Sequence, residues 1–263
     1  MTEQASSIPL SPPSTSSSRP STDLPTPGRA LAIGAHSDDV EFGCGGTLAK
    51  WAAAGAAVHL LVLTDGSKGT WDPDADLTEL VATRRREQQE AAAALGLTGV
   101  EFLDVPDGEL QSGLAERALV VAAIRRIRPD LVLGHDPWKR YRLHPDHRHA
   151  GWLVLDGVVA ARDHHYFPDQ GLPAHRPERI LLFEAEEVDH LERVGAELDA
   201  KVRALLCHRS QWRSTMGIEP EGPHRAAEQA AFEARVRDEA EAEVAGRGPG
   251  IGPAEGFKLI DKV

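Results

Sequence analysis

The segment RALAIGAHSDDVEFGCGGT, residues 29–47, joins a short apolar run to a cluster of polar residues and glycines. The run at 29–35 has the length and composition of a buried strand. A histidine, two adjacent aspartates and a glutamate follow it, and GCGG then leads into a helix predicted at 45–55. Reactive side chains directly after a buried strand favour an α/β sheet, because the ligand-binding loops of such sheets follow the carboxyl ends of the strands.

The rest of the chain repeats this alternation of apolar runs and amphipathic segments. Further strands are predicted at 58–64, 100–105, 129–135 and 179–185, and helices at 78–96, 114–128 and 147–162. We therefore predict an α/β fold, with a Rossmann-like, open and mostly parallel sheet that carries helices on both faces. If the five strands are arranged in the order 3-2-1-4-5, the first and fourth are neighbours and their loops face each other.

The two ends of the chain differ from this central part. Residues 1–28 are rich in serine and proline and have little to bury, so we predict a disordered tail. Residues 29–263 are predicted to form a single α/β domain, whose C-terminal part, about 190–263, is mostly helical. Within 224–246, apolar residues recur every four positions, which favours a flanking helix or a contact in a homo-oligomer.

Composition narrows the classes of function. The chain has 263 residues, with 29 Lys and Arg against 41 Asp and Glu, a net charge of −12. Binding to a nucleic-acid backbone needs clustered positive charge, so we expect no nucleic-acid partner. No apolar run approaches the ~20 residues that cross a bilayer. The two cysteines, Cys44 and Cys207, form no disulfide framework, and no secretory signal is visible, so a cytoplasmic protein is predicted.

Two loops gather the residues that carry chemistry. The first is HSDDVE, 36–41, after the first strand, and the second extends from His135 to His147 after the fourth. Two histidines and one carboxylate from these loops would give three ligands and an open position, which is typical of a catalytic zinc site. Imidazole also suits copper, nickel or iron. One of Asp38 and Asp39 would then be free to act on metal-bound water.

Each of these features also has a simpler interpretation. Adjacent aspartates after a strand often cap a helix, and a single histidine in a loop is more often solvated than a ligand. The GCGGT segment matches no phosphate-binding motif, so its glycines are interpreted as allowing the first helix to pack closely. Seven other histidines are expected at the surface or in loops: His149, His164, His165, His175, His190, His208 and His224.

At AHSDDVEFGCGGT (35–47) and HPDH (144–147) the chain resembles the PIG-L/LmbE family of zinc-dependent N-deacetylases. That family carries AHPDD-x-E-x-GCGGT after its first strand and HPDH after its fourth. The similarity covers roughly residues 29–185 and includes LVLTDG (61–66) and RPDLVLGHDPW (128–138). Ser37 stands where the family usually has proline, at a position that is not a ligand.

The resemblance implies a role for each residue of the two motifs. The implied zinc ligands are His36, Asp39 and His147. Asp38 is the implied general base. His144 is implied to stabilise the oxyanion or to protonate the leaving amine, and Asp146 to orient His144. Arg84 and Asp107 are similar to residues that contact the sugar.

The implied reaction is hydrolysis of an N-acetyl group from an amino sugar or a sugar-containing metabolite, with zinc-bound water as the nucleophile. The expected partner is a small N-acetylated sugar, and the expected cofactor is Zn²⁺, with Fe²⁺ or another divalent ion left open. Two rivals stay open as well. Two histidines and one carboxylate also form the iron(II) site of oxygenases. A sugar-binding module that had lost its metal and its activity would keep the same pocket.

Overall fold

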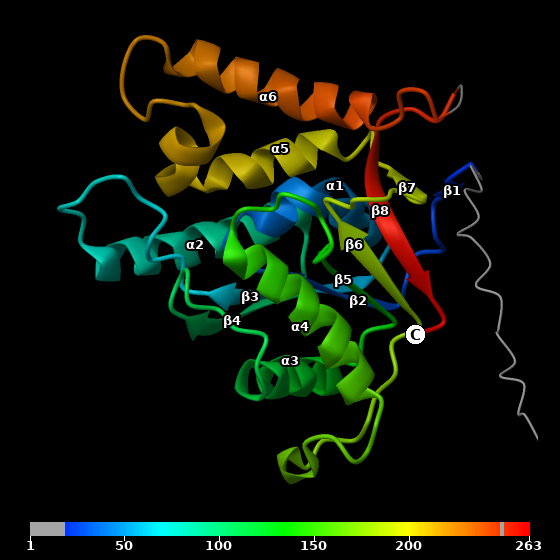
Figure 1. Ribbon diagram of the computed structural model, residues 1–263. Coiled ribbons are helices and arrows are strands. Elements are labelled where there is room, and N and C mark those ends of the chain that lie inside the picture. Colours follow the sequence, from blue (N-terminus) through cyan, green and yellow to red (C-terminus); the bar gives the residue numbers. More distant parts are fainter. Residues whose placement is uncertain (1–18, 248–249) are drawn as a thin grey trace, which may run out of the picture.

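The computed structural model describes residues 19–247 and 250–263 and contains one eight-stranded sheet (Figure 1). The strands are β1 (Ser21–Thr22), β2 (Arg29–Gly34), β3 (Ala57–Thr64), β4 (Gly99–Val105), β5 (Leu131–His135), β6 (Arg179–Phe183), β7 (His190–Arg193) and β8 (Ala254–Asp261). The helices are α1 (Asp39–Ala53), α2 (Leu77–Leu95), α3 (Leu114–Ile127), α4 (Pro145–Ala161), α5 (Leu198–Cys207) and α6 (Arg225–Ala242), with short turns η1 (Pro168–Gln170), η2 (Arg209–Gln211) and η3 (Trp212–Met216).

The strand order is β1-β7-β8-β6-β5-β2-β3-β4, and every pairing is parallel except those of β8. The five predicted strands are β2, β3, β4, β5 and β6, and their order β4-β3-β2-β5-β6 is the predicted 3-2-1-4-5. The predicted fold class is therefore confirmed. Because β2 and β5 are neighbours, the two loops that carry the chemistry leave the same edge of the sheet.

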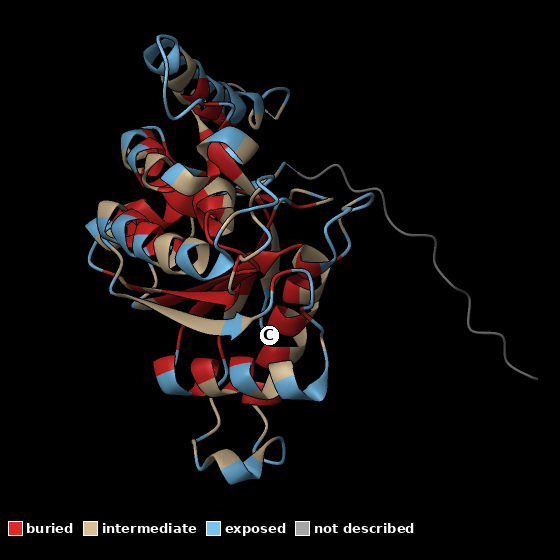
Figure 2. Cartoon of the chain, turned by 90° about the vertical axis from the view of Figure 1, so that its left-hand side faces the viewer, coloured by how far each residue is buried: buried red, intermediate tan, exposed pale blue. Residues whose placement is uncertain are grey.

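Alternating side chains of the strands fill two separate cores. On β2, Leu31 and Ile33 pack with residues of α3 and α4, whereas Ala30 and Ala32 pack with residues of α1. In Figure 1, α3 and α4 cover one face of the sheet, and α1, α2 and α5 cover the other. Figure 2 shows the buried strands between these two helical layers. The sheet thus forms a rigid support for the loops at its edge.

The C-terminal part differs from its prediction. It contains the helices α5 and α6 but also the strands β7 and β8, which the sequence did not predict. In β7 the alternating pattern is hidden because Glu192 is fully buried, where it forms an ion pair with Lys50 and a hydrogen bond with His190. His190 and His208, expected at the surface or in loops, are both buried. The apolar stripe of α6 packs on α5, so the feature that hinted at a homo-oligomer is an internal contact.

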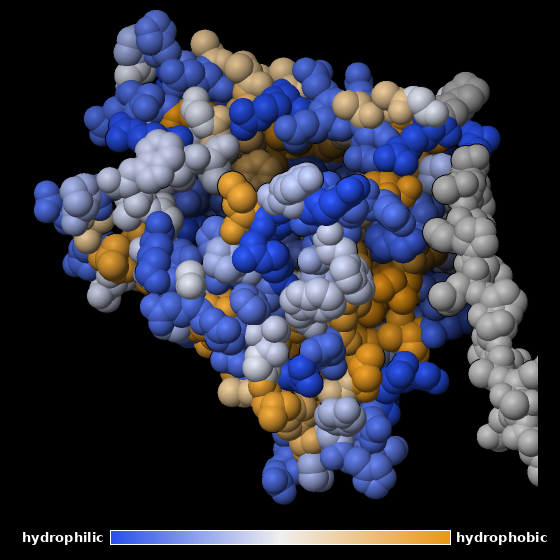
Figure 3. Space-filling view, in the orientation of Figure 1, coloured by the Kyte–Doolittle hydropathy of each residue, from blue (hydrophilic) through white to orange (hydrophobic). Residues whose placement is uncertain are grey.

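The predicted tail also needs correction. Residues 1–18 lie outside the described residues. Ser21 and Thr22, however, form β1 and pair with β7, so the prediction of a disordered tail up to residue 28 is wrong for this segment. Within the described residues, no helix combines the length and the apolarity that crossing a bilayer requires. The face shown in Figure 3 is mostly hydrophilic, with apolar residues in separate patches.

Candidate metal centre

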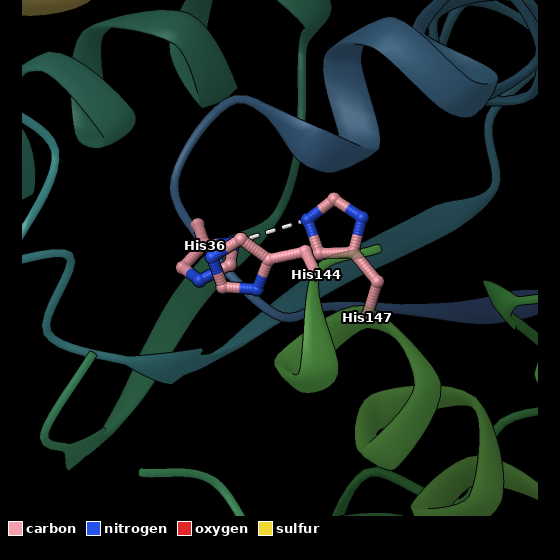
Figure 4. A group of neighbouring side chains, drawn as sticks. All are labelled: His36, His144 and His147. Atoms are coloured by element: carbon pink, nitrogen blue, oxygen red, sulfur yellow. Dashed lines mark hydrogen bonds between the residues drawn. The ribbon is translucent and has the colours of Figure 1, made fainter. Parts of the chain in front are cut away.

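The two sequence motifs meet at the start of two helices. Helix α1 begins at Asp39, earlier than predicted, and α4 begins at Pro145, where proline suits the first helical position. Residues 36–39 and 144–147 therefore lie side by side beyond the ends of β2 and β5. Figure 4 shows the rings of His36, His144 and His147 brought together, with a hydrogen bond between the first and the last.

The three predicted metal ligands are brought together with their donor atoms facing. Nδ1 of His36 lies 3.2 Å from Nε2 of His147 and 3.3 Å from Oδ2 of Asp39. Nε2 of His147 lies 3.2 Å from Oδ1 of Asp39. Two ligands bound at zinc distances to one tetrahedral ion are about 3.3 Å apart. Both the spacing and the donor set, two imidazoles and one carboxylate, therefore fit a divalent ion such as zinc.

The charges around His36 also favour a cation. Its Nε2 lies 3.2 Å from Asp107 and 3.2 Å from Asp146. Burial opposes a charge on the ring, but hydrogen bonds to Asp107, Asp146 and Asp39 outweigh it and raise the pKa of His36 to about 12. Burial raises the pKa of Asp39, but the charges of His147 and His135 hold it well below its usual range.

Asp107 and Asp146 lie on the Nε2 side of His36, and both are also close enough to His144 to share an ion with it. Oδ2 of Asp146 faces His36 and accepts the N–H of Gly108 over 2.7 Å, and no hydrogen bond joins Asp146 to His144 within the described residues. Asp107 is buried, and it accepts the N–H of Lys68 over 3.0 Å. A carboxylate behind a ligating histidine fixes the orientation of the ring. The contacts thus favour a role in orienting His36 for both, and the predicted contacts of Asp146 with His144 and of Asp107 with a sugar stay predictions.

Asp38 lies beside the ligands in an unusual backbone conformation. Its φ of 89° and ψ of −27° fall in a region that costs a residue other than glycine about 1–3 kcal/mol. Its side chain makes no helix-capping hydrogen bond, and Oδ2 is buried without a hydrogen-bond partner among the described residues. Burial, opposed by the charge of Arg84, raises the pKa of Asp38 to about 7. A carboxylate with this pKa and a free oxygen suits a general base.

Arg84 and His144 take different positions around this centre. Arg84 is buried and donates to the carbonyl oxygens of Ser37 and Gly66, over 2.9 and 3.0 Å. Arg84 thus joins the two loops that contain Ser37 and Gly66. Its contact with a sugar stays a prediction. His144 is exposed at the start of α4, and its ring meets the ring of His36 edge-on with centroids 4.6 Å apart. It is therefore placed to meet a ligand that approaches from solvent.

One residue of the centre was given no role by sequence reasoning, although it begins the second of the two predicted loops. His135, at the end of β5, is buried, and its ring stacks on His147 with centroids 4.4 Å apart. Its Nε2 lies 3.2 Å from Oδ2 of Asp39, and its Nδ1 lies 3.1 Å from Glu184. Asp39, His135 and His147 are close enough to share an ion. The available signal was the position of His135 at the carboxyl end of a central strand.

The glycines after the first motif allow the close packing that was predicted. A Cβ atom on Gly43 would lie 2.4 Å from the ring of Phe183, which itself packs on His135. Helix α1 also bends here, because Cys44 has φ −152° and ψ 18°. Gly43 therefore lets the start of α1 lie directly against β6, beside the proposed metal ligands.

Comparison with known proteins identifies the family. Residues 31–158 match the PIG-L family, described as GlcNAc-PI de-N-acetylase. The chain is 35% identical over 187 residues to the diacetylchitobiose deacetylase of Thermococcus kodakarensis, covering 70% of each chain. The chain belongs to the PIG-L family. Its fold also resembles the structure of N,N'-diacetylchitobiose deacetylase from Pyrococcus horikoshii, with a TM-score of 0.77, 29% identity and coverage of 89% of this chain and 84% of that one.

The PIG-L relatives also include a protein with another chemistry. The 4-oxalmesaconate hydratase of Pseudomonas putida is 27% identical over 193 residues, which is 69% of this chain and 73% of that one. The relative of higher identity is a deacetylase, as is the similar structure from Pyrococcus horikoshii, and the chain contains clusters of His and Asp that could hold a metal ion. The PIG-L chain is therefore an N-deacetylase with a candidate metal site, and these matches do not favour an oxygenase or an inactive binding module.

Proposed function

We propose that the PIG-L chain uses zinc to remove the acetyl group from an N-acetylated amino sugar. The observation that carries the proposal is the triad of His36, Asp39 and His147, with donor atoms 3.2–3.3 Å apart, beside a buried Asp38 whose carboxylate has a free oxygen. The deacetylase relatives support an N-acetylglucosaminyl substrate, since diacetylchitobiose carries its acetyl groups on amino sugars.

His36, Asp39 and His147 would hold the ion. Zinc held by these residues would lower the pKa of a bound water to around 7 and would polarise the acyl carbonyl. Asp38 accepts the proton of the attacking water, because its carboxylate is not engaged in capping α1. Asp107 and Asp146 keep the ring of His36 in place from behind.

His144 is the proposed hydrogen-bond donor to the developing oxyanion, and the leaving amine takes up the proton that Asp38 accepted from the water. Burial and the charge of His36 lower the pKa of His144, so a neutral ring that donates one N–H is available at pH 7. One donor of this kind contributes roughly 3 kcal/mol to transition-state stabilisation in other enzymes. Its exposed position at the start of α4 lets it reach a bound substrate.

The test combines metal analysis with an assay of acetate release from diacetylchitobiose and N-acetylglucosamine. Asp38→Asn is expected to keep bound zinc and to lower kcat by about 10²–10⁴. Asp39→Ala is expected to lose the metal. Wild-type turnover by Asp38→Asn would overturn the assignment of the base. Hydration of an unsaturated dicarboxylate without acetate release would favour the hydratase chemistry, and oxygen uptake with bound iron would favour an oxygenase.

We further propose a small-molecule substrate and a cytoplasmic location. Cys44 and Cys207 are unpaired in the folded chain, which suits a reducing compartment. The net charge of −12 supports a partner other than a nucleic acid. Fractionation of the native cells, with the protein detected in the cytosolic fraction, tests the location.

A further inference from the structure

Two side chains of helix α2 bind one peptide group of the loop 36–39, one at its carbonyl oxygen and the other at its N–H. Arg84 and Gln88 lie four positions apart, so they face the same side of the helix. Arg84 donates to the carbonyl of Ser37 over 2.9 Å, and the N–H of Asp38 donates to Oε1 of Gln88 over 3.2 Å. These two backbone atoms belong to the same peptide group. Its plane, and with it the backbone angle φ of Asp38, is therefore fixed from α2.

Glu41 sets the direction in which the side-chain amide of Gln88 points. Gln88 and Glu41 are both fully buried, and Nε2 of Gln88 donates to Oε1 of Glu41 over 2.6 Å. The N–H of Asp38 can only donate and the carboxylate of Glu41 accepts. The amide oxygen must therefore face Asp38 and the amide nitrogen must face Glu41. Glu41 thus fixes the amide in the one orientation that can accept from Asp38.

We propose that Gln88 is a positioning residue for Asp38 and that Glu41 is the group that orients Gln88. This inference rests on the proposed function, because it takes Asp38 as the general base. A residue other than glycine rarely adopts a φ of 89°, so Asp38 needs its neighbours to hold it there. Within the described residues, Gln88 makes its side-chain hydrogen bonds to Asp38 and Glu41 alone, and none to the metal ligands.

The test separates positioning from simple structural support. It removes the hydrogen bond between Gln88 and Glu41 and then restores it with the donor and the acceptor exchanged. Gln88→Met keeps the size of the side chain and removes both hydrogen bonds. It is expected to lower kcat about tenfold, with KM and bound zinc unchanged, as when outer partners of a site are lost. Gln88→Glu sets two carboxylates against each other and is expected to lower kcat similarly. Adding Glu41→Gln lets an amide at position 41 donate to a carboxylate at position 88, which can accept from Asp38.

The double variant Glu41→Gln/Gln88→Glu is expected to recover kcat to within about threefold of wild type, which a loss of mere packing would not allow. A matched control is His190→Gln, which disturbs another buried polar group, on β7 near the far edge of the sheet, and should lower stability without changing kcat. Unchanged kcat in Gln88→Met, or no recovery in a folded, zinc-loaded double variant, would overturn the inference. Failure of the proposed function would be seen differently, as absence of acetate release by the wild-type protein itself.

Discussion

A buried ion pair between α5 and β8 supports the helix on which the metal loop stands. Nζ of Lys201 lies 2.7 Å from Oε1 of Glu255, and their side chains are 9% and 4% exposed. Glu255 also accepts the N–H of Gly46 over 2.9 Å, and both the N–H and the hydroxyl of Thr47 over 2.7 Å. Gly46 and Thr47 lie two and three residues after the bend of α1 at Cys44. The pair thus ties β8 to the start of the helix that begins with Asp39.

Lys201→Met removes the charge and keeps most of the length of the side chain. It leaves the carboxylate of Glu255 buried without its counter-ion, and removal of one partner from a buried pair costs about 3–5 kcal/mol. Three hydrogen bonds to Glu255 survive, so we expect the lower end, about 3 kcal/mol. At 2–4 °C for each kcal/mol in a chain of this size, the melting temperature should fall by roughly 6–12 °C.

The assay is thermal and urea unfolding of both proteins at pH 7, with equal zinc loading. The control is Arg209→Met, which breaks the exposed pair of Arg209 with Glu90, 59% and 50% exposed, and should leave the melting temperature nearly unchanged. A melting temperature for Lys201→Met within about 2 °C of wild type would refute the reasoning. It would mean that Glu255 is not held as a buried charge that needs Lys201.

Two further predictions concern the packing of α1 and a buried histidine. Gly43→Ala would place a Cβ 2.4 Å from Phe183 and should lower the free energy of unfolding in urea by about 1–3 kcal/mol, whereas Gly195→Ala, with its nearest neighbour at 3.7 Å, should not. Burial and the charge of Arg84 lower the pKa of His208 from 6.5 to about 3, so the unfolded chain binds a proton there first as pH falls. The contribution of neutral His208 to stability is thus complete above pH 6.5 and is lost as pH falls toward 3, by about 1.4 kcal/mol per pH unit. His208→Leu should unfold in urea with a weaker dependence on pH between 6 and 4, and an identical dependence would contradict a buried neutral ring.

The strands and helices that were predicted correctly are those with a local pattern of apolar residues in the sequence. The strands from β2 to β6 are apolar runs between helices, and both motifs follow such runs, so their meeting at one sheet edge follows from the strand order. β7 was not predicted because its residue Glu192 is buried against Lys50 and His190. Lys50 is distant in the sequence, and His190 is itself a polar residue. Tertiary contacts of this kind produce no hydrophobic periodicity in the sequence.

The same reason explains which roles at the site could not be predicted. A motif gives the type of each residue and its spacing, but it does not say which nitrogen of His36 faces the ion. That choice depends on Asp107 and Asp146, which come from a turn after β4 and from the first turn of α4 and meet behind the ring. His135 likewise reaches Asp39 only because β5 pairs with β2. Side chains that act through one another are visible only once the chain is folded.

The adjacent aspartates can divide their roles only because the backbone between them changes conformation. Asp39 is the first residue of α1, and its Oδ2 accepts the N–H of His36 over 2.7 Å, which holds the carboxylate on the ligand side. Asp38 stays outside the helix at a positive φ, so its carboxylate points elsewhere. Ser37 stands where the resemblance to the family implies a proline, which would have stiffened the loop. The hydrogen bonds that Arg84 and Gln88 of α2 make with the peptide group between Ser37 and Asp38 add a restraint on this loop.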